Sequence, residues 1–169
     1  MIDIRPFTDK DWAALWRMME PVFWAGETYA FAADMTEPEG RGIWIDLPVA
    51  TFVAIDDSGE ILGTYYLKAN SAGPGDHVCN CGYIVGEAAR GKGVASVMCD
   101  HSQQQAVTHG FRAMQFNSVV STNEGAIRLW QKHGFEIVGT LPQAYRHARL
   151  GFVDSFVMYK KLTSSVMDA

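Results

Sequence analysis

The sequence has few cysteines and no long apolar run, and both facts narrow its class. Three cysteines among 169 residues, an odd number, argue against a disulfide framework. No stretch of about twenty apolar residues is present, and no leader pattern follows Met1. We therefore expect a cytoplasmic protein without a membrane partner.

Positive charge is also scarce. Lys and Arg number 14 against 19 Asp and Glu, for a net charge of −5, so no broad basic face is expected and nucleic acid is not the expected partner. The chain is 48% hydrophobic and 20% charged, as is ordinary for a globular protein. Its length predicts one domain over residues 1–169.

A cysteine-rich metal site is not expected either. His77, Cys79 and Cys81 alternate, so on a strand they would share one face and could resemble metal ligands. No second cluster of Cys or His supplies the remaining ligands. We expect these small side chains to pack beneath a helix, and we expect no metal.

What the chain does have is a stretch with two glycines and two cations where a strand becomes a helix. Tyr83–Val85 is an apolar run typical of a strand, and a helical pattern begins at about Val94. Between them stands Arg90-Gly91-Lys92-Gly93. The free N–H groups and the dipole of a helix start favour an anion, and glycines let the backbone approach it closely. The stretch predicts a phosphate or pyrophosphate cradle.

Three kinds of phosphate loop can be compared with this stretch. A P-loop would need Ser or Thr after Gly91-Lys92, but Gly93 stands there, so the hydroxyl that holds Mg²⁺ is missing. A dinucleotide fingerprint would need a third Gly where Ser96 stands. The acyl-CoA loop of the GCN5-related N-acetyltransferase (GNAT) family, Arg/Gln-x-x-Gly-x-Gly/Ala, fits Arg90 to Ala95 at every fixed position.

The order of expected elements is strand, two helices, three strands, helix, strand, helix and two strands, a mixed α/β arrangement around one sheet. We expect Pro21 to end the first helix and a capping box at Thr36 to begin the second, which runs to about Leu47. We expect a loop over residues 141–151 between the last two strands.

Two further motifs resemble the GNAT family. Asn123-x-x-Ala126-x-x-Leu129-Trp130-x-x-x-Gly134-Phe135 is similar to the family's second signature, and the closing strand from Asp154 to Lys160 is similar to the family's ending. The resemblance covers essentially the whole chain. It implies an α/β (α+β) fold with a mixed sheet of about seven strands and about four helices, and an acetyl-CoA-dependent N-acetyltransferase activity.

The resemblance also implies positions for the acyl donor. The pantetheine arm of acetyl-CoA is expected along the backbone of Tyr83, Ile84 and Val85, and next to Asn123 and Trp130. The family often has a Tyr at the position of Trp130, as the acid for the leaving thiolate, and an indole N–H is a very poor acid. The pyrophosphate is expected on Arg90, Gly91, Lys92, Gly93, Val94 and Ala95.

The acceptor side rests on a narrower resemblance, to the branch that contains the yeast azetidine-2-carboxylate acetyltransferase. It implies that Asn80 and Asn117 lie near the acceptor, where carboxamides orient an amine or carboxylate. No acid or imidazole stands at a signature spacing. Glu27 is a candidate base, and Tyr145 is either a proton donor or an ordinary loop residue.

The expected function is acetyl transfer to the amine of a small molecule, with an amino acid or its analogue favoured. Two alternatives stay open, namely a nonenzymatic acyl-CoA-binding module and a protein or peptide N-terminal acetyltransferase. Many relatives pair, so a homodimer is also an open expectation.

Overall fold

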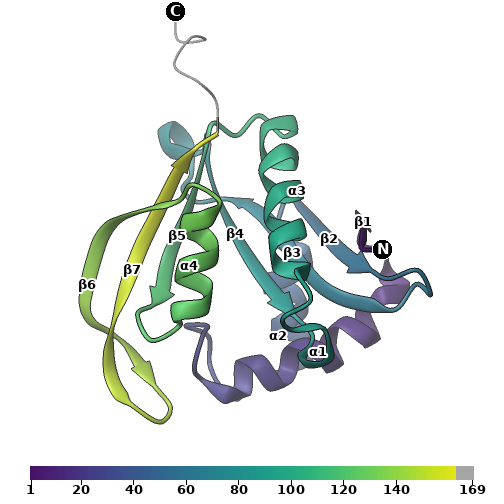
Figure 1. Cartoon of the computed structure of the whole chain (residues 1–169), viewed down its shortest axis with the longest axis horizontal. Coiled ribbons are helices and arrows are strands. Elements are labelled where there is room, and N and C mark those ends of the chain that lie inside the picture. Colours follow the sequence, from purple (N-terminus) through teal and green to yellow (C-terminus); the bar gives the residue numbers. More distant parts are fainter. Residues whose placement is uncertain (163–169) are drawn as a thin grey trace, which may run out of the picture.

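One seven-stranded sheet runs through the computed structural model, which describes residues 1–162 (Figure 1). The strand order is β1-β2-β3-β4-β5-β7-β6. The expected mixed sheet is confirmed, and the last seven residues of the expected domain lie outside the described part. The strands are β1 (Asp3–Pro6), β2 (Ala50–Ile55), β3 (Ile61–Ala69), β4 (Val78–Val85), β5 (Ala113–Val120), β6 (Glu136–His147) and β7 (Gly151–Lys161).

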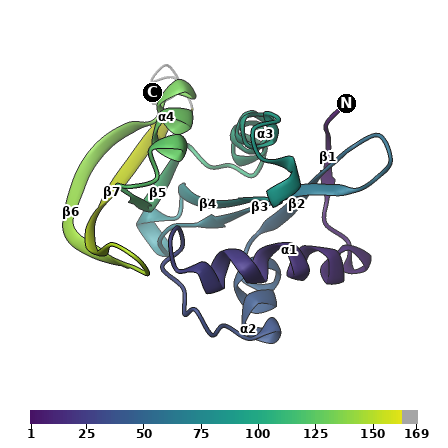
Figure 2. The ribbon, with the colours of Figure 1, turned by 60° about the horizontal axis from the view of Figure 1, so that its bottom comes forward.

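Helices cover both faces of the sheet, as Figure 2 shows. One face carries α1 (Trp12–Ala25) and α2 (Glu37–Arg41), and the other carries α3 (Val94–Thr108) and α4 (Glu124–Lys132). Each face buries its own apolar cluster, one built around Trp44 and Phe23 and the other around Met98 and Phe135. About four helices were expected, and residues 1–162 contain four α-helices. None of the helices in residues 1–162 is both long and apolar enough to cross a membrane.

The two central strands pair over only a short length. β4 and β5 form the one parallel pair within the described sheet, and their register covers only Val78–Ala113 and Cys79–Met114. All other neighbours in the sheet are antiparallel and pair over longer stretches. The sheet is therefore open between β4 and β5 beyond these two pairs, and both strands leave backbone groups unpaired with each other there.

The prediction that Pro21 ends the first helix is wrong. Helix α1 continues to Ala25 and ends at Gly26, which has φ of 61°. Pro21 is exposed, so the carbonyl one turn before it, which loses its N–H partner, can bond to water instead. The capping box at Thr36 is confirmed, and α2 is followed by a π-helical segment at Gly42–Asp46.

The predicted loop over residues 141–151 is also wrong. β6 runs on to His147, with a register shift between Leu141 and Tyr145. Pro142 lies in this bulge, and an edge strand tolerates a proline because one of its sides needs no N–H donor. Gln143 has φ of 50°, and its N–H donates to the Asp154 carboxylate at 2.8 Å. Only a short turn then joins β6 to β7.

A partly buried ion pair joins β1 to the start of α1. The Asp11 carboxylate accepts two hydrogen bonds from the Arg5 guanidinium, at 2.7 and 2.8 Å, and also bonds the backbone N–H and the hydroxyl of Thr8. Asp11 is 8% exposed. The hydrogen bonds from Arg5 lower the pKa of Asp11 to about 2.

This lowered pKa predicts an acid-sensitive contribution to stability. The contribution is present above the unfolded pKa and is lost as pH falls through the folded pKa, that is, between about pH 5 and pH 2. Asp11→Asn should cost about 2 kcal/mol of unfolding free energy at pH 7, and the difference from the wild type should shrink as pH falls through that window. Urea denaturation at each pH measures it. Asp9→Asn is the control, since Asp9 makes an exposed ion pair with Arg41 and should change little.

Candidate active site

The hydrogen bonds between β3 and β4 determine which backbone groups of β4 face the opening toward β5. At one end of the β3–β4 pair, the N–H of Asn70 donates to the carbonyl of Val78 at 2.8 Å. Just past the other end of the pair, the N–H of Gly86 donates to the carbonyl of Leu62 at 2.9 Å. In an antiparallel pair, alternate residues turn both backbone groups to the partner strand, and those between turn them away. Even-numbered residues of β4 therefore face β3, and odd-numbered residues face the opening toward β5.

The three residues predicted to hold the pantetheine arm differ in the direction of their backbone groups. Tyr83 and Val85 turn their N–H and C=O groups into the opening. Ile84 turns its backbone to β3, where a Cβ added to Gly63 would lie 2.9 Å from the Ile84 carbonyl oxygen, and its side chain is buried under α1. The prediction for Ile84 does not fit this orientation, because only the backbone groups of Tyr83 and Val85 face the opening where the arm is expected.

The wall of the opening on the α3 and α4 side is aromatic. The Trp130 ring lies 4.8 Å from that of Tyr83 and 4.9 Å from that of Phe116. Trp130 is 9% exposed, and the Tyr83 hydroxyl lies 2.7 Å from Ser102 Oγ in the core. Tyr83 thus turns its backbone groups to the opening, while its side chain packs with Trp130 on the α3 and α4 face of the sheet.

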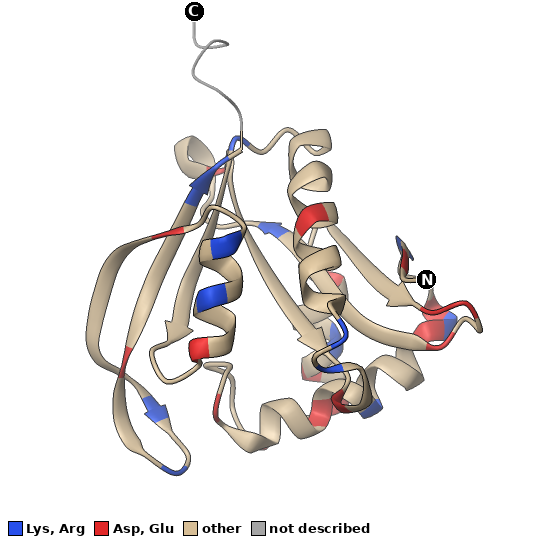
Figure 3. Ribbon diagram, viewed as in Figure 1, with Lys and Arg blue, Asp and Glu red and all other residues tan. Residues whose placement is uncertain are grey.

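The strand continues into the predicted phosphate loop. Gly91 and Gly93 have φ of 74° and 82°, and Gly93 is the N-cap of α3. A Cβ at either glycine would meet no protein atom within 4 Å, so the space in front of both is open. Arg90 and Lys92 are exposed here. Figure 3 shows basic residues both on this loop and on α4, the helix next to α3 on the same face of the sheet. The loop is therefore built to accept an anion.

The opposite face of the opening carries carboxamides. Asn80 is 9% exposed, accepts a hydrogen bond from the Tyr66 hydroxyl at 3.1 Å and donates to the Gln115 carbonyl at 3.0 Å. Gly82 makes room for this, because a Cβ there would lie 2.5 Å from the Tyr66 ring. Asn80 thus spans β4 and β5 where their backbone pairing ends.

Asn117 belongs to a second, exposed amide group beside it. Its side chain accepts from Gln115 Nε2 at 2.9 Å and donates to Asn70 Oδ1 at 2.7 Å. Gln115 connects Asn80 and Asn117, because its backbone carbonyl accepts from Asn80 and its side chain donates to Asn117. The role of both residues at an acceptor stays a prediction.

The connection between α1 and α2 reaches into the opening through Tyr29. Its hydroxyl donates to the carbonyl of Tyr83 at 2.6 Å, which is one of the groups that face the opening. Its ring stacks on Phe31 and packs against Phe23 and Trp44. Burial raises the pKa of Tyr29, so the phenol remains a donor. Tyr29 was not predicted as a site residue, because its segment has no clear period and only the density of aromatic residues distinguishes it.

The β6–β7 hairpin holds the same connection from the other side. Tyr145 donates its hydroxyl to the Tyr29 carbonyl at 3.0 Å. Arg149 Nε lies 2.6 Å from Glu27 Oε1, and the N–H of Ala148 donates to Gly26 at 3.1 Å. Glu27, the candidate base, is therefore ion-paired, Tyr145 contacts the backbone of Tyr29, and the roles of both at the site stay predictions. We call this set of contacts the hairpin clasp.

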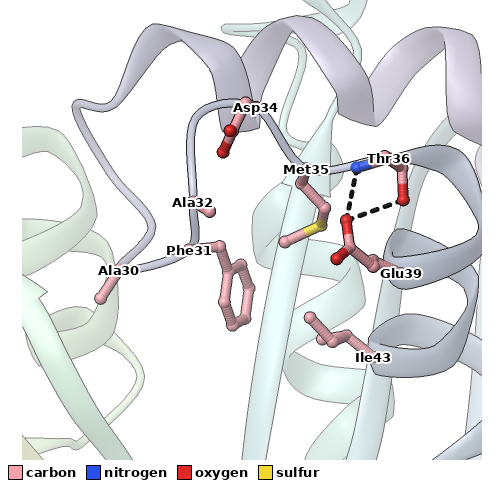
Figure 4. A pocket seen from close by; sticks show the side chains of 8 residues that line it. All are labelled: Ala30, Phe31, Ala32, Asp34, Met35, Thr36, Glu39 and Ile43. Carbon is pink, nitrogen blue, oxygen red and sulfur yellow. Dashed lines mark hydrogen bonds between the residues drawn. The ribbon is translucent and has the colours of Figure 1, made fainter.

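A pocket of about 460 Å³ lies beside the same connection (Figure 4). Phe31 points into it, and Asp34 lies at its rim. Glu39 also lines it, and its carboxylate bonds the N–H and hydroxyl of Thr36. Since Phe31 also stacks on Tyr29, the pocket adjoins the ring that reaches β4. The full lining is Ala30, Phe31, Ala32, Asp34, Met35, Thr36, Glu39 and Ile43.

The structure also gives the surroundings of the other residues that the sequence singled out. Asn123 caps α4, its side chain accepting from the N–H of Ala126 at 3.3 Å, so its expected place beside the donor arm stays a prediction. Cys79 and Cys81 are free and buried under α3, and burial raises the pKa of Cys79 to about 12. Within residues 1–162 no three His, Cys, Asp or Glu side chains are grouped to hold a metal.

Comparison with known proteins then decides the family. The model of the acetyltransferase (GNAT) family matches residues 12–135. This chain belongs to that family. It is therefore an N-acetyltransferase, and the expected family is confirmed.

Individual relatives agree with the family. N-acetyltransferase aca1 of Schizosaccharomyces pombe is 30% identical over 160 residues, covering 85% of this chain and 76% of the relative. A GCN5-related N-acetyltransferase from Kribbella flavida has a TM-score of 0.90 at 38% identity, over 95% of this chain and 97% of that one. A phosphinothricin acetyltransferase from Sinorhizobium meliloti, solved with AcCoA, has a TM-score of 0.83 at 18% identity, over 95% and 88%. The GNAT fold expected from the sequence is confirmed.

Proposed function

We propose that this chain transfers the acetyl group of acetyl-CoA directly to the amine of a small molecule, with an amino acid or its analogue favoured. The observation that carries the proposal is the open edge of β4. Backbone groups of Tyr83 and Val85 face an unpaired space that runs on to the glycine loop at the start of α3. The relative from Sinorhizobium meliloti, solved with AcCoA, supports the choice of donor.

In this proposal the donor lies along the edge. The pantetheine amides bond the groups of Val85, and the pyrophosphate lies on residues 90–95. The N–H of Tyr83 donates to the thioester oxygen, which gains charge when the amine attacks. Holding donor and acceptor in one opening supplies the proximity that a two-substrate reaction needs.

The protons need two partners. The amine must lose one, and Glu27 is the carboxylate of the hairpin clasp that we assign to this step, directly or through water. The leaving thiolate must gain one. Of the phenols in the site, Tyr29 reaches the β4 edge itself, whereas Tyr145 donates to the Tyr29 backbone. We therefore assign the thiolate's proton to Tyr29 and a supporting role to Tyr145.

The acceptor is small because the opening is roofed. The hairpin clasp holds residues 26–29 against β4, which leaves less room for a folded polypeptide than an open groove would. Asn80 and Asn117 offer carboxamides that orient polar groups of the acceptor. A structural neighbour named a phosphinothricin acetyltransferase supports an acceptor of this class, and the likeness to N-acetyltransferase aca1 is consistent with the azetidine-2-carboxylate branch.

The first test is thiol release from acetyl-CoA against amino acids, their analogues, polyamines and short peptides. We expect turnover with at least one small amine, at a rate well above hydrolysis without acceptor. Turnover confined to peptides would contradict the small-molecule acceptor. Binding of acetyl-CoA with no turnover across the panel would contradict the enzyme assignment and favour a binding module.

Gly93→Ala should weaken acetyl-CoA binding by about tenfold or more, because the new Cβ would stand in the open space where the backbone meets the phosphates. Gly110→Ala is a matched control. Gly110 has φ of 85° and, like Gly93, no protein atom within 4 Å of an added Cβ. Both changes should cost about 1 kcal/mol of stability through the positive φ, but only Gly93→Ala should change the calorimetric affinity. Equal affinities for the two variants would exclude the loop as the phosphate site.

Asn117→Ala should raise KM for the acceptor by about fivefold, as expected for one lost hydrogen bond of about 1 kcal/mol. KM for acetyl-CoA should change less than twofold. Gln104→Ala removes an exposed carboxamide from α3 and should change neither constant. If Asn117→Ala affected both substrates alike, its place at the acceptor would be refuted.

A further inference from the structure

A hydrogen-bonded chain of hydroxyl, imidazole and carboxylate joins α3 to α4 next to the glycine loop. Ser96 Oγ lies 2.8 Å from His133 Nε2, and His133 Nδ1 lies 2.9 Å from Asp100 Oδ1. The His133 side chain is 9% exposed and that of Asp100 is 65% exposed. Ser96 is the third residue of α3, three residues after Gly93. The chain therefore ends at the turn of helix that faces the proposed pyrophosphate.

The position of the imidazole is held from several sides. His133 is the C-cap of α4, its N–H bonds the carbonyls of Leu129 and Trp130, and its own carbonyl accepts from Lys160 Nζ at 2.7 Å. The charged groups that the described residues place around it are Asp100 from α3 and Lys160 from β7, with Lys132 beside it in the sequence. Because a carboxylate only accepts, Nδ1 carries a proton in either charge state of the ring. Nε2 is the nitrogen whose protonation can change.

The direction of the Ser96 hydrogen bond depends on that proton. When His133 is neutral, Nε2 has only a lone pair, so the Ser96 hydroxyl must donate its single proton to the ring. Its oxygen then presents only lone pairs to an anion. When Nε2 is protonated, the ring donates to Ser96 Oγ and the hydroxyl proton is free to bond a phosphate oxygen.

We propose that His133 is a positioning residue that takes up a proton when acetyl-CoA binds, so that Ser96 can donate its hydroxyl proton to a phosphate oxygen. The inference rests on the proposed function, because it requires the pyrophosphate at residues 90–95. Asp100 stabilises the imidazolium that forms. Binding that requires a proton is tighter at low pH and weakens as pH rises.

The test is titration calorimetry of acetyl-CoA with the full chain between pH 7 and 9, in buffers of different ionisation enthalpy. In this range phosphate monoesters, with a second pKa of about 6, are already ionised. We expect net proton uptake and a Kd that rises by up to about tenfold per pH unit, the limit for one linked proton. Wild-type binding without proton uptake would overturn the inference and leave the proposed function standing. Absence of acetyl-CoA binding would overturn both.

Variants test whether the proton that is taken up binds to His133 and whether its uptake depends on Ser96. His133→Gln can still bond Ser96 but cannot titrate, so uptake should vanish and Kd should become independent of pH. Ser96→Ala keeps the imidazole and should also abolish uptake; unchanged uptake in this variant would show that the charge of the ring acts without the hydroxyl and would overturn the relay. His109→Gln is the matched control, an exposed imidazole at the other end of α3, and should leave uptake as in the wild type.

A milder variant covers the case in which His133→Gln does not fold. Asp100→Asn changes an exposed group and removes the negative charge that favours the imidazolium. The pH dependence of Kd should then move to lower pH. An unchanged pH profile in Asp100→Asn would contradict the relay.

Discussion

The structure depends on two parallel strands that pair over only two registered residues. After Cys79 and Met114, β4 and β5 separate, and the acetyl transfer that we propose uses the backbone left free there. Unpaired N–H and C=O groups inside a protein are costly unless they find partners. Here one of them, the Tyr83 carbonyl, bonds Tyr29, and Asn80 bridges the strands through its side chain. The rest form the polar wall that we propose to bind an amide-containing arm.

Aromatic side chains pack on both faces of the sheet where the strands separate. On the α3 and α4 face, Trp130 lies between Tyr83 and Phe116, and Phe116 stacks on Phe135 at 4.4 Å. On the other face, Tyr66 crosses β4 over Gly82. Large rings therefore pack on both faces of the sheet beside the opening, and β5 has a register shift between Phe116 and Val119 at the same place.

Local patterns predicted much of this, and nonlocal contacts account for what was missed. Apolar runs, caps and glycines predicted seven strands, four helices and the loop at Gly91 and Gly93, because those signals act within a few residues. Pro21 misled the prediction of the first helix, since the effect of a proline depends on whether the carbonyl that loses its hydrogen bond faces water, which tertiary structure decides. Tyr29 and His133 could not be found either. Their partners lie 54 and 37 residues away in the chain, and no spacing rule connects them.

The hairpin clasp has a consequence for how the chain can diversify. The proposed donor site is built from β4, α3 and α4, which lie in the central part of the sequence. The segments that cover the proposed acceptor site are residues 26–29, nearer the N-terminus, and the β6–β7 turn, nearer the C-terminus. The two segments touch each other at Glu27 and Arg149, at Gly26 and Ala148, and at Tyr29 and Tyr145, and the Tyr29 hydroxyl bonds the Tyr83 carbonyl of β4. If the proposed function holds, matched changes in these two segments that keep Glu27 and Tyr29 would alter which amine is accepted and leave the donor site as it is.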